Sequence, residues 1–482
     1  MLPRPLKNRI IIRPAVVLYL SLLTVLCSSC MNYYQTIYTF NSNFERGNFG
    51  EAQAALAKDK KAETRKTKLL YYMNMGVVAS LQGNYAESNV YFEKAYMLGE
   101  DYQVNYLNEA ASFLLNPNIV EYKGEDFEIL MVHYYKALNF LKLGDKEAAL
   151  VECKRMDIKL SKLSSKYTSE NKFQRDAFIH LLMGIIYDAN GDANNAFIAY
   201  RNALDIYQND YHKFFNQEVP QQLKEDLLRT AYVNNFSEDL RRYEKEFGMQ
   251  YKHDKSKKGD LVFLWHNGLG PVKVENGINF TILRGQGGVV NFTNQDLALN
   301  FAFPMDDSTY HKSGLSSLEF IRITFPKYVE RPALYNHAQL VWNDQSYPLN
   351  LAEDVNAIAF KTLNQRMLLE VGKSVLRVAL KKAAEYTMRK ENDNAGALIG
   401  LVNAITEQAD TRSWQSVPHG IYYTRLSLPE GNQQVQFITK SGINAGMEQT
   451  HPMNFDIKAG KTLFHTFHSL EMSAPITAVS GY

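Results

Sequence analysis

The sequence predicts a multidomain α+β protein, in which an N-terminal all-α helical array precedes a mixed α/β C-terminal domain with mostly antiparallel strands and one long helix. Glycine, small and aromatic residues recur at helical spacing up to about residue 250, which is typical of stacked helix pairs. From residue 261 short apolar runs separated by turn residues indicate strands instead. The predicted boundaries are 1–29 for a signal peptide, 30–250 for the helical array, 251–260 for a linker and 261–482 for the C-terminal domain.

Composition narrows the class of protein. The chain has 482 residues, of which 45% are hydrophobic and 22% charged, and its formal net charge is +2. This length predicts two to three globular domains. A charge excess this small, without a basic arm, argues against nucleic acid as a partner.

The first thirty residues have the organisation of an export signal. Basic residues precede an apolar run over 15–26, which is shorter than a membrane-spanning helix. Two serines then directly precede Cys30, and this ending resembles the lipobox of bacterial lipoproteins. The resemblance implies that Cys30 carries acyl groups as the first mature residue and that Cys27 leaves with the signal peptide. An uncleaved anchor helix and a plain secretory signal are the alternatives, and all three readings place the rest outside the cytoplasm.

Two further expectations follow if Cys30 is acylated. The membrane becomes a partner through the anchor, and we expect the outer membrane, facing the periplasm, because Met31 and Asn32 lack the aspartate that holds some lipoproteins at the inner membrane. Cys153 is then the remaining cysteine, and its apolar helical neighbours predict an inert core thiol.

Three segments of the N-terminal half share one spacing. The separations of 7, 5, 4 and 3 residues recur at Gly76, Gly83, Ser88, Phe92 and Ala95, at Ala137, Gly144, Ala149, Cys153 and Met156, and at Gly184, Gly191, Ala196, Tyr200 and Ala203. Small residues at these positions let two antiparallel helices cross closely, and the second residue of each set suits a helix C-terminus with positive φ.

This spacing resembles the tetratricopeptide repeat, although His133 and His180 stand where that family prefers tryptophan. The resemblance implies a stack of helix pairs with a grooved inner face that binds protein segments. The alternative is an array that only spaces the next domain from the membrane.

The C-terminal half alternates between strand and helix patterns. A buried strand at 261–265 and a turn at 266–271 open it. Proline is expected to end the strand over 320–325. Further strands are predicted at 280–283, 339–342, 420–426, 434–438 and 462–467, with a long helix over 352–390. This order predicts a mixed α+β domain or a β-sandwich with a helical insertion.

Two motifs of this half carry a second resemblance. The stretches GDLVFLWHNG at 259–268 and ADTRSWQSVP at 409–418 resemble a family of bacterial envelope lipoproteins that join tetratricopeptide-like helices to a C-terminal domain with both motifs. The resemblance covers nearly the whole chain and implies no established enzymatic activity. Family members are often encoded near a lipoprotein activator of penicillin-binding proteins, which implies a role in envelope or peptidoglycan biogenesis.

The motifs supply the candidate functional residues Trp265, His266, Asn267, Arg412 and Trp414. His266 follows a buried strand, where catalytic side chains are common. No nucleophile with a recognisable local signature accompanies it, so a turn histidine bonded to backbone is the preferred interpretation.

The two tryptophans leave alternatives open. Trp265 and Trp414 could stack a sugar ring, with nearby carboxylates serving glycan hydrolysis. We favour the interpretation that both fill the core and that Arg412 neutralises Asp410 in a tight loop.

No catalytic residue, cofactor site or metal site is predicted. His465 and His468 are three residues apart, so on a strand they point to opposite faces and fit one metal ion poorly. The long helix has a basic side between Lys373 and Lys390, which is typical of a solvated helix face and also of a helix lying on a membrane.

Together these patterns predict a membrane-anchored, periplasm-facing lipoprotein that acts as a protein–protein interaction scaffold in the cell envelope, with peptidoglycan as a further candidate ligand. The alternative is an envelope glycan-processing hydrolase or a glycan-binding module in the C-terminal domain. A hydrolase predicts a water-accessible cleft around His266 or Trp414 with convergent titratable groups. A scaffold predicts an open, aromatic-lined groove on the helices.

Overall fold

The computed structural model describes residues 35–106, 121–165, 173–254, 256, 258–285, 288–391, 409–442 and 447–473. Cys27 and Cys30 lie outside the described residues. The chain divides into two compact units, residues 1–62 and 63–482. The described part of the first unit holds helical residues 35–45 and α2 (Phe49–Ala57), joined at Gly47.

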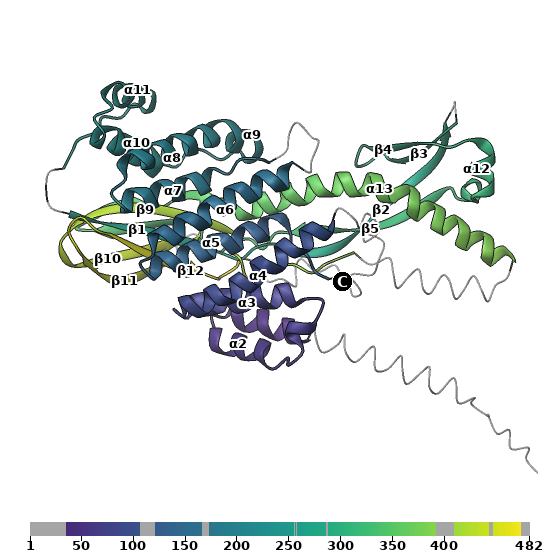
Figure 1. Ribbon diagram of the computed structural model, residues 1–482, viewed down its shortest axis with the longest axis horizontal. Helices are drawn as coiled ribbons and strands as arrows, with labels where there is room; N and C mark the ends of the chain where they lie inside the picture. The colour runs from purple at the N-terminus through teal and green to yellow at the C-terminus, as the bar shows by residue number, and fades with distance from the viewer. Residues whose placement is uncertain are drawn as a thin grey trace, which may run out of the picture. The chain divides into compact units, whose positions relative to one another are not determined.

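The second unit begins with the helical array (Figure 1). Its helices pair in chain order, each pair joined by a short turn. The pairs are α3 (Lys68–Leu81) with α4 (Tyr85–Tyr106), α5 (Asp126–Lys142) with α6 (Lys146–Ser164), and α7 (Ala177–Ala189) with α8 (Ala193–Ile206). The array continues through the π-helix η3 (Tyr207–Tyr211), α9 (His212–Phe215), α10 (Gln221–Val233) and α11 (Ser237–Phe247).

The turns within the pairs confirm the glycine pattern. Gly83, Gly144 and Gly191 follow the first helix of each pair with φ of 82°, 82° and 78°. An L side chain rarely adopts this backbone conformation, so glycine is required where each helix ends.

The crossings within the pairs confirm the small-residue pattern. A Cβ added to Gly76 would lie 2.7 Å from the ring of Phe92, and one added to Gly184 would lie 2.5 Å from the ring of Tyr200. Ser88 also donates a hydrogen bond of 2.6 Å to the carbonyl of Gly76. The missing side chains therefore let an aromatic ring of the second helix lie directly on the first.

Strands follow from Lys258 and form three four-stranded sheets. The first has the order β12 (Thr462–Ser469), β1 (Lys258–Asn267), β9 (Gly420–Pro429), β8 (Asn350–Glu353). The second has the order β11 (Glu448–Ile457), β10 (Gly431–Lys440), β6 (His337–Trp342), β7 (Gln345–Pro348). The third has the order β4 (Leu299–Pro304), β3 (Val289–Asn294), β2 (Val272–Gly285), β5 (Phe320–Val329). β1 thus begins inside the stretch predicted as a linker.

β1 is the most enclosed strand of the first sheet. It pairs in parallel with β12 and antiparallel with β9. Phe263 and Trp265 point into a core shared with the second sheet, where Phe437 and Leu340 meet them. Leu264 and His266 point to the opposite face and are buried as well. Burial on both faces explains why this strand is a continuous apolar run.

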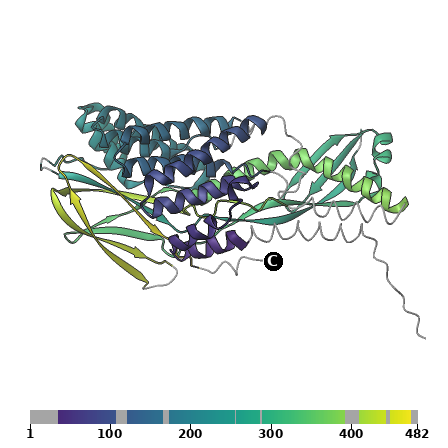
Figure 2. The same ribbon diagram turned by 60° about the horizontal axis from the view of Figure 1, so that its bottom comes forward.

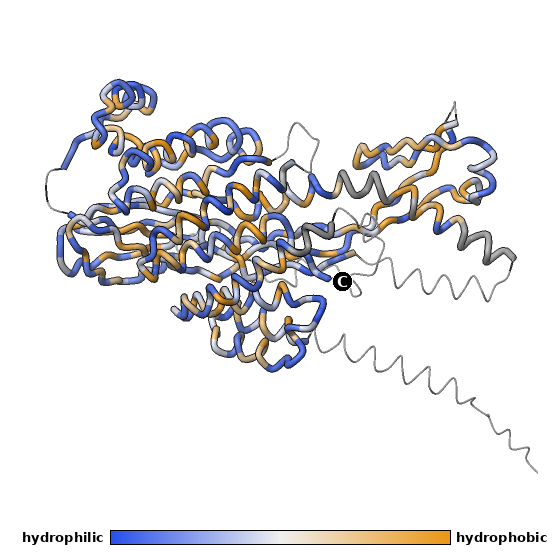
Figure 3. The backbone as a smooth tube through the Cα atoms, in the orientation of Figure 1, coloured by the Kyte–Doolittle hydropathy of each residue, from blue (hydrophilic) through white to orange (hydrophobic). Residues whose placement is uncertain are grey.

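The third sheet has its own core. α13 (Val355–Glu391) packs on it through Val375, Val378, Ala379 and Ala383, all buried. The apolar side of this long helix therefore covers protein. The small helices α12 (Asp307–Lys312) and η4 (Leu315–Ser317) complete this region, and Figure 3 shows α11 and α12 as mainly hydrophilic.

The prediction that proline ends the strand at 325 is wrong. β5 continues through Pro326, which lies opposite Glu275 of β2. β5 is an edge strand of its sheet, so the missing N–H of Pro326 leaves no ladder bond unmade.

None of the helices within the described ranges combines the length and the apolar character that a membrane crossing requires.

We predict that Gly184→Ala destabilises the protein by about 1–3 kcal/mol, because the new methyl group overlaps the Tyr200 ring. The control is Gly50→Ala in α2, where no atom lies within 4 Å of the new Cβ and alanine favours the helix. Denaturant unfolding measures both variants. Equal effects would contradict the close crossing of α7 and α8.

Candidate functional site

The helices lie as a layer over one face of the first sheet (Figure 2). The first helix of each pair faces the sheet, as does α10. Tyr134 of α5 reaches β1, Asp188 of α7 and Asp226 of α10 reach β9, and Asn74 of α3 reaches the loop before β9. The face that was expected to be an open groove is therefore covered at these positions by the chain's own C-terminal region.

His266 lies in the middle of this interface. Its Nε2 is 2.6 Å from the hydroxyl of Tyr134, and its Nδ1 is 3.2 Å from Nδ1 of His468 on β12. Burial, and then the neighbouring His468 and Lys142, lower the pKa of His266 well below its usual value. His266 is thus a neutral strand residue bonded to side chains, which corrects the expectation of a turn histidine bonded to backbone.

Trp265 and Asn267 flank His266 but point away from the helices. The indole N–H of Trp265 donates a hydrogen bond of 2.9 Å to Ser469 of β12, and its ring packs against Tyr422 with centroids 4.8 Å apart. The side-chain amide of Asn267 donates a bond of 2.7 Å to the carbonyl of Tyr335. Both side chains tie β1 to its neighbours.

Trp414 and Arg412 belong to the loop that precedes β9. The Trp414 ring lies among aromatic rings of the array, 6.0 Å from that of Phe92 and 5.8 Å from that of Tyr135 between centroids. Arg412 binds Asp410 through Nε and Nη2 at 2.8 and 2.7 Å and covers the ring of Tyr122. This geometry agrees with the preferred interpretation of both residues.

Glu128 of α5 holds the same loop from the helical side. It accepts hydrogen bonds of 2.7 Å from the backbone N–H of Trp414 and 2.6 Å from the hydroxyl of Tyr122. Burial, and then the Glu125 carboxylate, raise the pKa of Glu128 to about 7. Burial would also raise the pKa of Glu125, but Arg366 and Lys273 hold it below its usual value.

Arg425 of β9 forms the second polar group of the interface. Its guanidinium lies 2.9 Å from Asp226, 2.9 Å from Asp188 and 3.0 Å from Asp260, and it donates to the Tyr200 hydroxyl at 3.0 Å. Burial alone would lower the pKa of Arg425, but Asp226 and its neighbours raise it well above the usual value. The side chain is therefore a permanent buried cation surrounded by acceptors from both layers.

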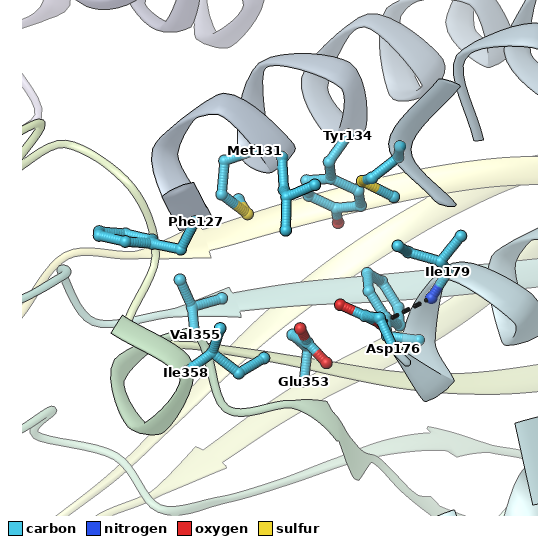
Figure 4. Close-up of a pocket in the computed structure, with 11 residues that line it drawn as sticks. Phe127, Met131, Tyr134, Asp176, Ile179, Glu353, Val355 and Ile358 are labelled. Carbon is cyan, nitrogen blue, oxygen red and sulfur yellow. Dashed lines mark hydrogen bonds between the residues drawn. The ribbon is translucent and has the colours of Figure 1, made fainter. Parts of the chain in front are cut away.

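A small pocket lies between α5, α7 and the β8–α13 junction (Figure 4). Asp176 and Glu353 point into it, and its other lining residues are mostly apolar, among them Met131 and Ile358. The space open to the centre of a water molecule is about 20 Å³, which suits about one water and no organic substrate. Burial, and then Asp176, raise the pKa of Glu353 well above its usual value.

The two C-terminal histidines lie on opposite faces of β12, as predicted. His468 packs edge-on to His266 on the helical face, whereas His465 packs against Phe263 and Phe455 in the sandwich core. In the described ranges no group of three or more His, Cys, Asp or Glu side chains is arranged to hold a metal ion.

The arrangement is suited to holding two layers together. His266 and Trp414 are each only 1% exposed, so the water-accessible cleft that the hydrolase hypothesis requires is not found around them. Trp265 is fully buried and offers no ring face to a sugar. Cys153 is buried, and burial raises the pKa of its thiol, which disfavours the reactive thiolate.

Sequence reasoning missed the residues that carry the interface charges. Arg425 gave a visible signal, since it is a charged residue inside the apolar run of β9. Glu128 and Asp226 gave none, because charged residues on helices normally face solvent. Glu128 pairs with the loop before β9, 286 residues away, and Asp226 pairs with Arg425 of β9 itself, about 200 residues away, so both pairings are properties of the tertiary fold.

No protein-family model and no curated protein matches the chain. Solved structures similar to the chain include MamA from Desulfovibrio magneticus RS-1 (41-end), at 15% identity over 45% of this chain and 92% of that chain with a TM-score of 0.29. The apo form of RapI is 16% identical over 47% and 57%, with a TM-score of 0.33. A tetratricopeptide repeat protein from Parabacteroides merdae ATCC 43184 is 15% identical over 46% and 94%, with a TM-score of 0.18. Likeness at this level assigns no function.

We predict that Arg425→Met lowers the free energy of unfolding by about 1.5–3 kcal/mol, because it removes the charged hydrogen bonds from the sheet to Asp226 and Asp188 and leaves these carboxylates with Arg229 of α10 alone. The matched control is Arg175→Met, which removes the ion pairs of a half-exposed guanidinium with Asp205 and Asp210 and should change stability by less than about 1 kcal/mol. Urea unfolding at neutral pH compares them. Similar losses in both variants would show that the interface charges are solvated.

The Glu353 carboxyl predicts a pH effect. Its pKa is higher in the folded chain than the ordinary 4.5, so its contribution to stability is fully present below about pH 4.5 and is lost as the pH rises toward the folded value. Glu353→Gln keeps an acceptor for the Tyr211 hydroxyl and removes the charge. The variant should equal wild type in acid and exceed it by about 1 kcal/mol or more near pH 8.

Thermal melts across this range measure the difference. Glu218→Gln is the control, because Glu218 is 84% exposed. A wild type and a Glu353→Gln variant with the same pH dependence would contradict the raised pKa.

Proposed function

We propose that this protein is a lipid-anchored scaffold of the bacterial cell envelope, which binds protein partners on its outer helical surface. The observation that carries the proposal is the interface itself. Trp414, His266 and Arg425 all make contacts that join the helical array to the first sheet and the loop before β9. The array and the sheets belong to one compact unit, residues 63–482, so they act as a single platform and not as two binding modules on a linker.

The interface also changes which surface we expect to bind a partner. The partner was expected on the grooved inner face of the array, but Tyr134, Glu128 and Asp226 of the helices that face the sheet contact the C-terminal region. A partner must therefore use the second helices or the free surfaces of the sheets. Anchoring of such a platform would raise the local concentration of its partner at the membrane.

The envelope location rests on the sequence of the first thirty residues. We predict that Cys30→Ser releases the protein from the membrane fraction, because the acylated residue is lost. Cys27→Ser is the matched control and should leave the mature protein anchored, since residue 27 departs with the signal peptide. Membrane fractionation and the intact mass of the purified protein check both variants. A mature protein that carries no mass beyond its polypeptide would contradict the anchor.

The scaffold role is tested by crosslinking in intact cells, followed by identification of the bound proteins. A defined partner that is lost in Cys30→Ser cells, in which the chain is no longer anchored, would support the proposal. Crosslinks to glycan fragments without any protein partner would favour the glycan-binding alternative.

A further inference from the structure

Exposed aliphatic side chains lie on the second helices of the repeats. Val90 and Met97 of α4 are 57% and 59% exposed, Val151 and Ile158 of α6 are 46% and 56% exposed, and Ile198 of α8 is 38% exposed. Single exposed aliphatic residues are normal on protein surfaces, so these exposed fractions alone do not indicate a binding site. The stronger indication is that these residues occupy equivalent positions in the repeats.

The positions repeat from pair to pair. Val90, Val151 and Ile198 each follow by two residues the buried small residue at the helix crossing, which is Ser88, Ala149 or Ala196. Met97 and Ile158 each stand seven residues further on. Equivalent positions in a repeat stack line up across neighbouring units, and residues seven apart share one helix face. These five residues therefore form what we call the outer row.

Side-chain contacts link α4 to α6 at this level. The guanidinium of Arg155 lies over the Tyr96 ring, 5.5 Å from its centroid, and Lys159 pairs with Glu100. Tyr96 directly precedes Met97 and Lys159 directly follows Ile158. Met97 and Ile158 are therefore each next in sequence to a residue through which α4 and α6 touch, and the outer row extends over both helices.

Basic side chains interrupt the outer row. Lys94 lies between Val90 and Met97 along α4, Lys154 lies between Val151 and Ile158 along α6, and Arg201 follows Ile198 by one turn. All three are exposed. Lys94 forms an ion pair of 3.5 Å with Glu63, but both side chains are about half exposed, so solvent leaves this pair weak.

Acidic residues also lie beside the outer row, but they already have basic neighbours: Glu93 pairs with Lys136 at 2.5 Å, Glu100 pairs with Lys159, and Asp157 faces His180 of α7 at 3.6 Å. Glu87 and Glu147 stand in the first turns of α4 and α6. A uniformly anionic membrane surface would meet these carboxylates as well as the lysines. A peptide helix can place its own carboxylates opposite the basic side chains alone, with its apolar side on the outer row.

We propose that the outer row binds an acidic amphipathic helix of a protein partner. The helix lays its apolar side across Met97 and Ile158, and its carboxylates pair with Lys94 and Lys154. This inference rests on the proposed scaffold function and names the surface and the chemistry of its partner.

The test uses the full chain carrying Cys30→Ser and a synthetic amphipathic helix with a leucine side flanked by glutamates. Its twin has lysines in place of the glutamates. We expect the acidic peptide to bind by fluorescence anisotropy, Ile158→Glu and Lys154→Glu each to weaken binding by about tenfold or more, and the lysine twin to bind at least about tenfold more weakly. Val233→Glu is the control, since Val233 is 49% exposed on α10 outside the outer row, and it should bind as wild type does.

Several results would overturn the proposal. Equal binding of the two peptides would remove the charge argument, and undiminished binding to Ile158→Glu would place the peptide elsewhere. Binding to vesicles of anionic phospholipid that Ile158→Glu abolishes would assign the outer row to a membrane surface. Self-association in sedimentation that Ile158→Glu abolishes would assign it to a second copy of the chain.

Crosslinking in cells separates this proposal from the scaffold function. Partners that persist in cells carrying Ile158→Glu would leave the scaffold function standing and remove the outer row as its site. An absence of protein partners in wild-type cells would remove the scaffold function itself.

Discussion

The structure depends on one buried cation. Arg425 extends from the first sheet and meets Asp188 of α7 and Asp226 of α10, two helices that do not belong to the same repeat pair. Arg229 of α10 also pairs with both carboxylates, but the buried charge of Arg425 is fully compensated only when the helices and the sheet are together. This requirement fixes how the array is seated on the sheet.

In this arrangement the motif residues have structural roles. A tryptophan, a histidine and an asparagine in succession at the end of a strand suggest a reactive site. Here Trp265 faces the sandwich core, His266 faces the helices, and Asn267 binds the backbone of a neighbouring loop. The alternation of a strand sends three chemically rich side chains to three different neighbours, so they do not converge on one substrate.

Much of the fold was predictable, because local physics determines it. The glycines after α3, α5 and α7 and the small residues at the crossings specify paired helices without reference to the rest of the chain. β1 and α13 were also predictable from their apolar patterns. The packing of the array on the sheet was not, because it depends on pairs such as Glu128 with Trp414, which are far apart in sequence. A single sequence shows both residues of such a pair but not that they are in contact. The covering of the inner face of the array was therefore also missed.

The position of β12 has a consequence for how the chain is made. The last described strand lies in parallel beside β1, the first strand of the sandwich, and Ser469 accepts a hydrogen bond from Trp265 across 204 residues. Closing so long a loop is slow, and the pairing cannot form until β12 has left the ribosome. The edge of β1 that pairs with β12 therefore stays unpaired while the residues between the two strands are synthesised. The chain therefore reaches its finished form late, as a whole, and not segment by segment as it emerges.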